Sequence, residues 1–494
     1  MSERLRVSTK LSYGVGSIGE FAIYIAFNTW NFLFYNQVLG LSGTLAGMAV
    51  TISLVLDAIA DPVVGSLSDR YRGKLGRRHP FLYAAPIPLA ITFVLLYMPP
   101  TGLSGMGLFL WFTVFATLHR QAMTLYQVPH LALGAELSTD YHERSVVMSY
   151  HSLFMVVGGA GTFFFGWTWF SKIPGGVTSR AAYPGMAMGV ALLAALAIFV
   201  SAHFTRDQIP RLQQQLASSP PPERFSLRQL FSEIAQCMSN RNYRMLLLGL
   251  ICLSATTGTR ETVSTYASLF FWELPESKIR VFGLASPPAY IVAFILAVRL
   301  HRKFDKKNSI LGALIVLCLA TGLPVTTRFL GIAPPNGSSA LIGMLFVAVF
   351  TFYLAVAVLT ISVLSALADV ADEHELNTGK RQEGVFFAAR TLFAKLSSGL
   401  GHVVAGAGLD LIKFPTGAKP GQVPQDVVMN LGILDGPVAA IPALVSIVFY
   451  AAYRIDRDRH KAIQQQLTQR RSQAPAASPS EPPAPALGVE LAQS

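Results

Sequence analysis

Residues 43–67 read GTLAGMAVTISLVLDAIADPVVGSL, a largely apolar run whose charged residues are Asp57 and Asp61. A helix needs about 20 residues to cross a hydrocarbon core of about 30 Å, because each residue adds about 1.5 Å. The run is long enough to do so. It predicts a membrane-spanning helix that carries two costly carboxylates.

Similar runs recur along the whole chain. Hydrophobic residues make up 52% of its 494 residues and charged residues 13%, about half the share typical of soluble domains. We therefore expect an all-α integral membrane protein with twelve transmembrane helices. Their expected positions are 12–39, 43–67, 80–98, 104–134, 145–171, 181–203, 242–272, 278–300, 308–330, 338–368, 383–411 and 430–453.

The long polar segment 204–241 separates six of these helices from the other six. It predicts an N-terminal six-helix bundle over 1–203 and a C-terminal six-helix bundle over 242–453, as in carriers built from parallel repeats. Within the linker, 226–239 has the apolar spacing of an interfacial helix, and packing against the bundle is the alternative. The remainder, 454–494, is expected to be a largely disordered cytoplasmic tail.

The net charge of +12 does not indicate nucleic-acid binding, because most lysines and arginines lie in short loops or in the tail. They concentrate on one side of the expected topology, which predicts that both termini are cytoplasmic. The N-terminus lacks a small-residue cleavage site, so we expect no cleaved signal peptide. The chain should be a multi-pass protein of the cell (inner) membrane.

Asp57 and Asp61 are four residues apart, so both carboxylates lie on one face of their helix. Two like charges in low dielectric repel each other unless they share a cation or a proton. Pro62 lacks an N–H and leaves the carbonyl of Ala58 without its helical partner. The pair suits a monovalent cation, Na⁺ or Li⁺, or a proton. A structural pair bonded to other helices is the alternative.

Further charges lie in the expected helices 242–272 and 383–411. Lys395, with Thr391 one turn before it, can neutralise the aspartates when no cation is bound. A lysine that reaches the membrane interface is the alternative. Arg260 and Glu261 would contact either the transported solute or other side chains inside the bundle. Arg120 and Arg390 receive no role.

The loop after the second helix, GSLSDRYRGKLGRRHPF (65–81), predicts a cytoplasmic gate. Gly65 is expected to permit close helix approach. Asp69, Arg70, Arg77 and Arg78 are expected to form a charge network between helices, as carriers use to hold the inward gate. A solvated loop is the alternative for any single one of these residues.

Five stretches together resemble the glycoside–pentoside–hexuronide:cation symporter family of the major facilitator superfamily. They are KLSYGVGSIGEFA (10–22), LDAIADPVVG (56–65), GRRHPF (76–81), YQVPHLALGAE (126–136) and FAKLSSGLG (393–401), and the resemblance runs from about residue 10 to 411. It implies the major facilitator fold and a cation site at Asp57 and Asp61, assisted by Thr124. It also implies coupling roles for Lys395 and Thr391.

The sugar-binding positions of that family match less well. Gln127 stands where the melibiose permease has an essential aspartate, and Leu131 replaces its stacking tryptophan. These departures put galactosides in doubt. The substrate-binding residues that we expect at the midplane are Glu20, Tyr24, Gln127, His151 and Arg260.

The expected function is symport of a sugar or glycoside with Na⁺, Li⁺ or H⁺ by alternating access. A cation-coupled lysolipid or amphiphile carrier of the same superfamily and a non-transporting ligand sensor are the alternatives. No spacing of a nucleophile and a base indicates an enzyme. We expect no bound cofactor, no nucleic-acid partner and a monomer in the lipid bilayer.

Overall fold

The computed structural model describes residues 5–217, 226–379 and 383–473, and every regular element in these ranges is helical. The N-terminal half contains α1 (Val7–Leu33), α2 (Gly43–Arg70), α3 (His79–Ala84), α4 (Pro86–Leu96), α5 (Gly105–Glu136), α6 (Tyr141–Phe170) and α7 (Ala182–Phe204). The linker contains α8 (Ile209–Ala217) and α9 (Leu227–Cys237). The C-terminal half contains α10 (Arg241–Tyr266), α11 (Glu276–Ile279), α12 (Ser286–Phe329), α13 (Ser339–Thr378), α14 (Glu383–Leu411), α15 (Gln425–Ile433) and α16 (Ala439–Ala451), and α17 (Arg457–Gln473) follows it.

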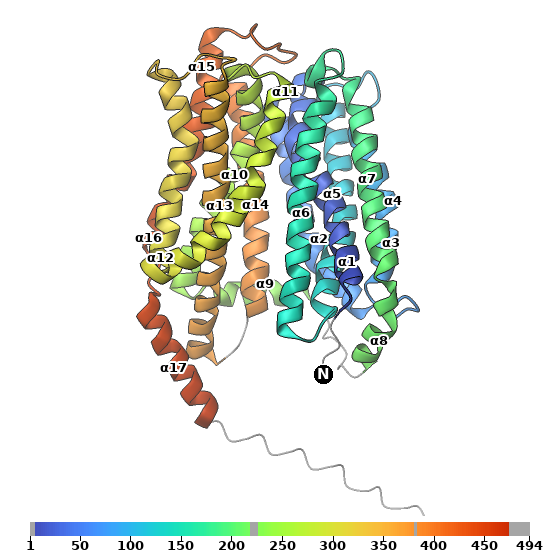
Figure 1. The fold of residues 1–494 in the computed structure, drawn as a ribbon, viewed down its shortest axis with the longest axis vertical. Coiled ribbons are helices and arrows are strands. Elements are labelled where there is room, and N and C mark those ends of the chain that lie inside the picture. Colours follow the sequence, from blue (N-terminus) through green and yellow to red (C-terminus); the bar gives the residue numbers. More distant parts are fainter. Residues whose placement is uncertain (1–4, 218–225, 380–382, 474–494) are drawn as a thin grey trace, which may run out of the picture.

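The two halves stand side by side with their helices roughly parallel (Figure 1). Each expected membrane span has a helical counterpart. The spans expected at 278–300 and 308–330 form one element, α12, whose backbone breaks at Asp305 with φ 69° and ψ 162°. Seven helical segments of the described residues are long and apolar enough to cross a membrane. The helices α1, α5, α10 and α14 are not among them, because they carry more polar residues. They contribute polar side chains to the site described below.

Helices α2 and α14 join the halves along a seam of glycines. A Cβ atom on Gly47 would lie 2.5 Å from the backbone oxygen of His402, and one on Gly406 would overlap the backbone oxygen of Gly43. Thr51 Oγ1 donates a hydrogen bond of 2.7 Å to the carbonyl of Gly399. The backbones of the two halves therefore touch without intervening side chains.

Among the described residues, hydrogen bonds hold the halves together at one of the two faces. We call the face where α1 begins and α17 lies the terminal face, and the other the opposite face (Figure 1). At the opposite face, Tyr266 donates to Asn36 Oδ1 at 2.7 Å, and the Val177 amide donates to Glu276 Oε1 at 2.5 Å. Asp410 accepts hydrogen bonds from the amides of Gly43 and Thr44, both at 2.8 Å.

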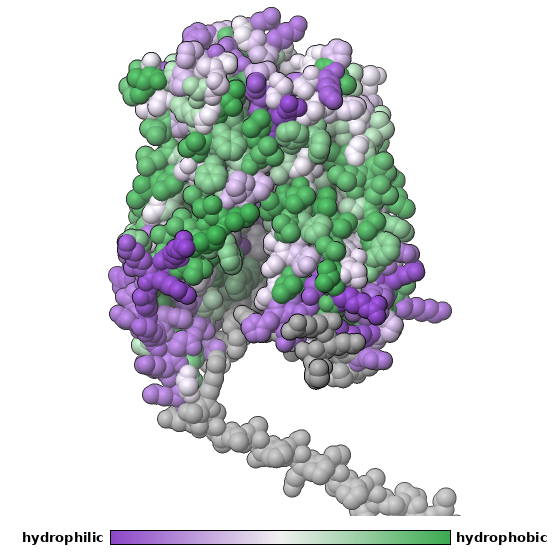
Figure 2. Space-filling model, viewed as in Figure 1, coloured by the Kyte–Doolittle hydropathy of each residue, from purple (hydrophilic) through white to green (hydrophobic). Residues whose placement is uncertain are grey.

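At the terminal face the surface is hollowed between the halves (Figure 2). The same view shows a hydrophobic belt around the middle of the molecule, with hydrophilic residues gathered towards both ends. This distribution fits a protein that spans a bilayer and is open to one side of it.

The expectation of a largely disordered tail over 454–494 is wrong for 457–473, which forms α17. Ile463 and Leu467, four residues apart, are buried on one face of α17. On α17, His460 Nε2 lies 3.1 Å from Asp372 Oδ2, and Arg459 pairs with Glu373 at 2.6 Å. Apolar burial and these polar contacts hold the helix on α13. Residues 474–494 lie outside the described residues.

The expected interfacial helix at 226–239 corresponds to α9. Its Ile234 and Cys237 are buried in the core of the C-terminal half, and Phe231 is half exposed. α9 therefore packs against that half with one face and leaves another uncovered.

Candidate cation site and cargo cavity

Asp57 and Asp61 lie on one face of α2 and share a hydroxyl from α5. Thr124 Oγ1 is 2.7 Å from Asp57 Oδ1 and 3.3 Å from Asp61 Oδ1. A hydroxyl has a single proton, so it donates to one carboxylate at a time and offers its lone pairs to a cation. The three residues place five oxygen atoms close together within the N-terminal half.

Lys395 reaches this group from α14, in the other half. Its Nζ donates to Asp57 Oδ2 at 2.7 Å and to Asp61 Oδ2 at 2.6 Å. Asp57 is 6% exposed, so its carboxylate is almost removed from solvent. A buried carboxylate pair needs positive charge, and here the Lys395 ammonium supplies it.

Arg120 on α5 is a second cationic group beside Asp57. Its Nη1 is 4.0 Å from Asp57 Oδ2, and its Nε donates to Ser53 Oγ at 3.0 Å. The guanidinium also lies over the ring of Phe27, 4.6 Å from its centroid. From the sequence alone we expected no role for Arg120.

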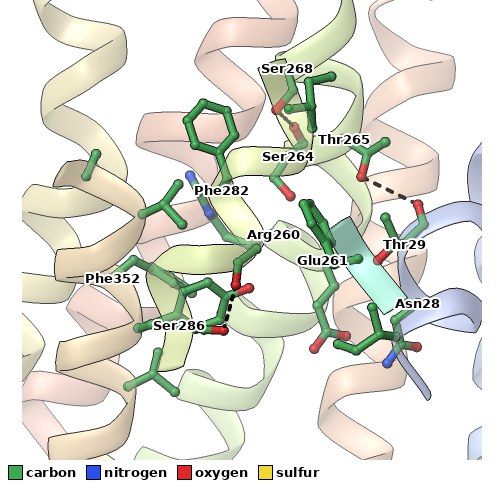
Figure 3. Close-up of a pocket in the computed structure, with 18 of the residues that line it drawn as sticks. Asn28, Thr29, Arg260, Glu261, Ser264, Thr265, Ser268, Phe282, Ser286 and Phe352 are labelled. Carbon is green, nitrogen blue, oxygen red and sulfur yellow. Dashed lines mark hydrogen bonds between the residues drawn. The ribbon is translucent and has the colours of Figure 1, made fainter. Parts of the chain in front are cut away.

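A cavity of about 540 Å³ lies between the halves. Aromatic residues of both halves line it, namely Phe21, Tyr24, Phe163, Trp167, Trp272, Phe282, Tyr290, Phe352 and Tyr353. Its polar lining residues include Asn28, Thr29, Arg260, Glu261, Ser264, Thr265, Ser268, Ser286 and Asp435, several of which are labelled in Figure 3. Many rings with a few polar groups are typical of small-molecule sites.

Arg260 and Glu261 are neighbours on α10 but have different partners. Arg260 Nη1 lies 3.4 Å from Asp435 Oδ1 and 3.2 Å from the backbone oxygen of Asp435. Glu261 interacts with the hydroxyl of Tyr24 across the two halves, and its Oε2 lies 3.8 Å from His402 Nε2. Arg260 is thus held inside its own half, whereas Glu261 faces the other half.

The other predicted cargo residues lie apart from this cavity. Tyr24 and Arg260 line it, whereas Glu20, Gln127 and His151 are not among its lining residues. Glu20 is 3% exposed and interacts with Gln127. His151 Nδ1 lies 2.7 Å from Ser17 Oγ within the N-terminal half.

Thr391, predicted to assist coupling, forms a hydrogen bond within α14 and not to the aspartates. Its hydroxyl donates to the carbonyl of Phe387 in its own helix, at 3.1 Å. Thr391 is exposed, one turn of α14 away from Lys395.

The charged loop after α2 forms a network between helices of one half. Arg78 pairs with Asp69 at 2.5 Å and with Glu136 at 2.6 Å, and Arg77 Nη2 lies 2.9 Å from Glu136. These pairs join the end of α2, the loop and α5, so they brace the N-terminal half and do not cross to the other half. Arg70 ends α2 beside Asp69.

Gly65 is not needed for close helix packing, contrary to expectation. A Cβ atom on it would meet Val128 Cγ1 at 3.5 Å, an ordinary contact. Glycines of the α2–α14 seam do permit close approach, as do Gly19 between α1 and α7 and Gly258 between α10 and α14.

The family described as MFS/sugar transport protein matches residues 12–457. The chain belongs to this family. The predicted resemblance is thereby confirmed, and the chain has the twelve-helix fold of the major facilitator superfamily as a multi-pass membrane transporter.

Relatives of this chain are named for different cargoes. The putative glycoside/cation symporter YagG of Escherichia coli is 24% identical, over 95% of this chain and 96% of that protein. The mouse sphingosine-1-phosphate transporter MFSD2B is 26% identical, over 90% of this chain and 88% of that protein. The inward-open structure of the E. coli xylose transporter XylE has a TM-score of 0.60 at 14% identity, covering 92% of this chain and 98% of that one. It shares the fold.

Sequence reasoning missed Asp435 and His402 in this MFS/sugar transport protein. Asp435 lies in the π-helical segment Leu434–Val438, inside the expected span 430–453. A charged residue within a membrane span is costly and therefore indicates a functional site. This argument singled out Asp57, and it applies equally to Asp435. His402 is paired with Thr262 at 2.7 Å, and its position two turns after Lys395 could have identified it.

Proposed function

We propose that this chain is a secondary active symporter, which couples a monovalent cation to transport of a sugar or glycoside by alternating access. The observation that carries this proposal is the position of Lys395. Its ammonium lies between Asp57 and Asp61 and comes from the opposite half of the molecule. A cation that takes this position would change the contact between the halves.

The coupling follows from charge balance. Without a cation, Lys395 compensates one of the two negative charges and ties α14 to α2. A cation that is held by Asp57, Asp61 and Thr124 replaces the ammonium, so Lys395 leaves and α14 is released. A ligand that changes the equilibrium between two states changes the affinity for the second ligand by the same factor. Na⁺, Li⁺ and H⁺ are the candidate cations, and they enter as co-substrates.

The cavity suits a cargo with apolar faces and several hydroxyl groups. Aromatic rings on both sides can pack against sugar rings, while Asn28, Glu261 and Ser264 can pair with hydroxyls. Gln127 is exposed and interacts with Glu20. We assign these two residues and His151 to cargo contacts in another state of the cycle.

An amphiphile with one chain, such as a lysolipid, is the second candidate cargo. The observation in its favour is the large share of aromatic and aliphatic side chains in the cavity lining, among them Phe282, Phe352 and Leu345. The relative named as a sphingosine-1-phosphate transporter supports the same candidate.

We further propose that the protein lies in the cell membrane as a monomer with its terminal face in the cytoplasm. Basic residues concentrate in the segments at that face, which supports this orientation. The hollow between the halves would then open inwards.

Uptake into oriented vesicles tests the proposal. The vesicles receive labelled glycosides, pentoses, uronates or lysolipids under an imposed gradient of Na⁺, Li⁺ or H⁺. We expect one cation to drive accumulation of a glycoside, and Asp57→Asn and Asp61→Asn each to abolish it. The matched control is Asp426→Asn, an exposed carboxylate at the start of α15, which should behave as the wild type. Accumulation that persists in both aspartate variants would refute the cation site, and accumulation of lysolipid alone would select the second candidate.

A further inference from the structure

We propose that Arg260 and Asp435 form a subsite for the cargo in the C-terminal half, which binds two adjacent hydroxyl groups of a neutral sugar or glycoside. One hydroxyl donates a hydrogen bond to the carboxylate of Asp435, and its neighbour accepts one from the guanidinium of Arg260. This inference rests on the proposed transport of such a cargo. It adds the pattern of hydroxyl groups that the cavity selects.

The ion pair of Arg260 and Asp435 is open within the described residues. Arg260 Nη1 donates to the backbone oxygen of Asp435 at 3.2 Å and lies 3.4 Å from Asp435 Oδ1. Arg260 Nε and Asp435 Oδ1 are buried and have no hydrogen-bond partner among these residues. A guanidinium donates several hydrogen bonds and a carboxylate accepts several, so both groups retain bonding capacity.

Two other buried carboxylates of this protein are paired more tightly. Lys306 Nζ donates to both carboxylate oxygens of Asp369 at 2.7 Å, and Lys395 Nζ donates to Asp57 Oδ2 at 2.7 Å. A buried charge is costly unless good geometry and hydrogen bonds compensate it. Asp435 is 5% exposed and lacks such hydrogen bonds within the described residues. A role in the fold alone does not account for this open geometry, whereas a cargo that supplies the missing hydrogen bonds does.

The pair borders the cargo cavity from two elements. Arg260 comes from α10, and its guanidinium lies over the ring of Phe352, 5.2 Å from the centroid. Arg260 and its neighbour Glu261 point to different sides of the cavity (Figure 3). Asp435 comes from the π-helical segment Leu434–Val438, and π-helical turns within α-helices are frequent at functional sites. The open pair therefore lies where a cargo can reach it.

The charges of the pair determine which cargo it takes. An anionic group beside Arg260 would be repelled by Asp435, and a cationic group beside Asp435 would be repelled by Arg260. A sugar hydroxyl is neutral and is both a donor and an acceptor, so two adjacent hydroxyls match an acceptor carboxylate beside a donor guanidinium. A site of this kind rejects an analogue that lacks the hydroxyl, because its own buried polar group is then left unpaired.

The test measures binding of defined glycosides to purified full-length protein. The probes are the methyl β-D-glycosides of glucose, galactose and xylose, with NaCl or LiCl present or at acidic pH, and affinity is read from the shift in melting temperature. The glycoside with the largest shift is then replaced by its monodeoxy analogues. Each analogue has a hydrogen atom in place of one ring hydroxyl.

The variants are Arg260→Gln, Asp435→Asn and their combination. The combination removes both charges together, so it leaves no uncompensated buried charge that could unfold the protein. The matched controls lie outside the cavity. They are Arg241→Gln, an exposed arginine at the start of α10, and Asp426→Asn, an exposed carboxylate at the start of α15.

Two adjacent hydroxyls should prove essential. Without either one, the analogue should bind to the wild type about 10- to 100-fold more weakly, as expected for a hydrogen bond to a charged group. Arg260→Gln and Asp435→Asn should each weaken binding of the parent glycoside by a similar factor. Each should change binding of the analogue that lacks its own hydroxyl partner by less than about twofold. Both controls should bind the parent glycoside as the wild type does.

Two results would overturn the subsite. Equal losses for the parent glycoside and all its analogues in the variants would mean that Arg260 and Asp435 only support the fold. Wild-type affinity for the parent glycoside in the combined variant would mean that the cargo does not touch the pair. Failure of the proposed cargo is distinct from both, because then no glycoside would shift the melting temperature of the wild type.

Discussion

Lys395 holds two carboxylates that lie one turn apart on α2, and its ammonium, with Arg120 beside Asp57, explains why the pair is tolerated in a membrane helix. A charge at the centre of a bilayer costs about 2.5–3.5 kcal/mol on insertion scales. The distances of 2.7 and 2.6 Å to Asp57 and Asp61 bring the three charges into one group. The group is stable while either the ammonium or a cation completes it.

Thr124 and Thr391 form a matched pair for testing the cation site. Thr124→Val removes the hydroxyl between Asp57 and Asp61, so cation affinity should fall by about tenfold, the equivalent of one hydrogen bond to a charged group. Thr391→Val removes a hydroxyl that bonds to Phe387 of its own helix and should change affinity little. Titration of purified protein with NaCl or LiCl measures both. Equal losses would show that Thr124 does not contribute an oxygen to the cation.

The sequence predicts the residues of the cation site better than those of the cargo site. Charges within spans are rare and costly, so Asp57, Asp61 and Lys395 are conspicuous without a structure. Cargo contacts come from ordinary polar residues, and their meeting depends on how helices of two halves are rotated. Tyr24 reaches the cavity but Glu20, four residues before it, does not line it.

At the scale of elements, the α2–α14 seam determines how the halves meet. Because glycines lie at the contact, the two backbones approach closely and α14 can bring Lys395 to α2. The same closeness makes the seam sensitive to volume. Membrane helices commonly use small residues in this way.

Gly406→Ala and Gly343→Ala should have opposite effects. In a helix, alanine normally stabilises by about 0.5–1 kcal/mol relative to glycine, as expected for Gly343, where an added Cβ meets no atom within 4 Å. At Gly406 the added Cβ would overlap the Gly43 backbone, so we expect a loss of about 1–3 kcal/mol. Melting of the purified variants measures both. A Gly406→Ala protein as stable as the wild type would show that the seam can widen freely.

Periodic apolar runs predict the membrane spans well, since length and hydropathy dictate them directly. Two features of the helices are not predicted by the sequence. α17 has a polar sequence, and the few buried contacts that hold it on α13, such as Ile463 and Leu467, depend on that partner. The break of α12 at Asp305 depends on local backbone geometry, with φ 69°.

At the scale of the whole molecule, the two faces of the protein differ in how they are held. The opposite face is fastened by hydrogen bonds between the halves, and the terminal face is hollowed (Figure 2). Alternating access requires that these bonds break when the molecule opens to the other side. Asp410, on α14, caps the N-terminus of α2, where its negative charge accepts hydrogen bonds from two backbone amides.

Asp410→Ala should shift the population towards the state open at the opposite face. The probe is a cysteine introduced at Ser268, which lines the cavity. We expect it to react about tenfold faster with an impermeant maleimide added at that face, which corresponds to a shift of about 1.4 kcal/mol in the free-energy difference between the two states. The labelling uses a background without Cys237, Cys252 and Cys318. Asp426→Ala, an exposed carboxylate at the same face, is the control. Unchanged labelling would mean that Asp410 does not hold the closed state.

The measurement that tests the central claim most directly is the cation affinity of Lys395→Met. If the ammonium competes with the cation for Asp57 and Asp61, its removal should raise affinity by about tenfold or more. The protein without cation should melt at a lower temperature, because a buried pair is left uncompensated, and the cation should restore it. A titration of Lys395→Met against the wild type decides the matter. An affinity that is unchanged or weaker would contradict the account, because Lys395 would then not occupy the place of the cation.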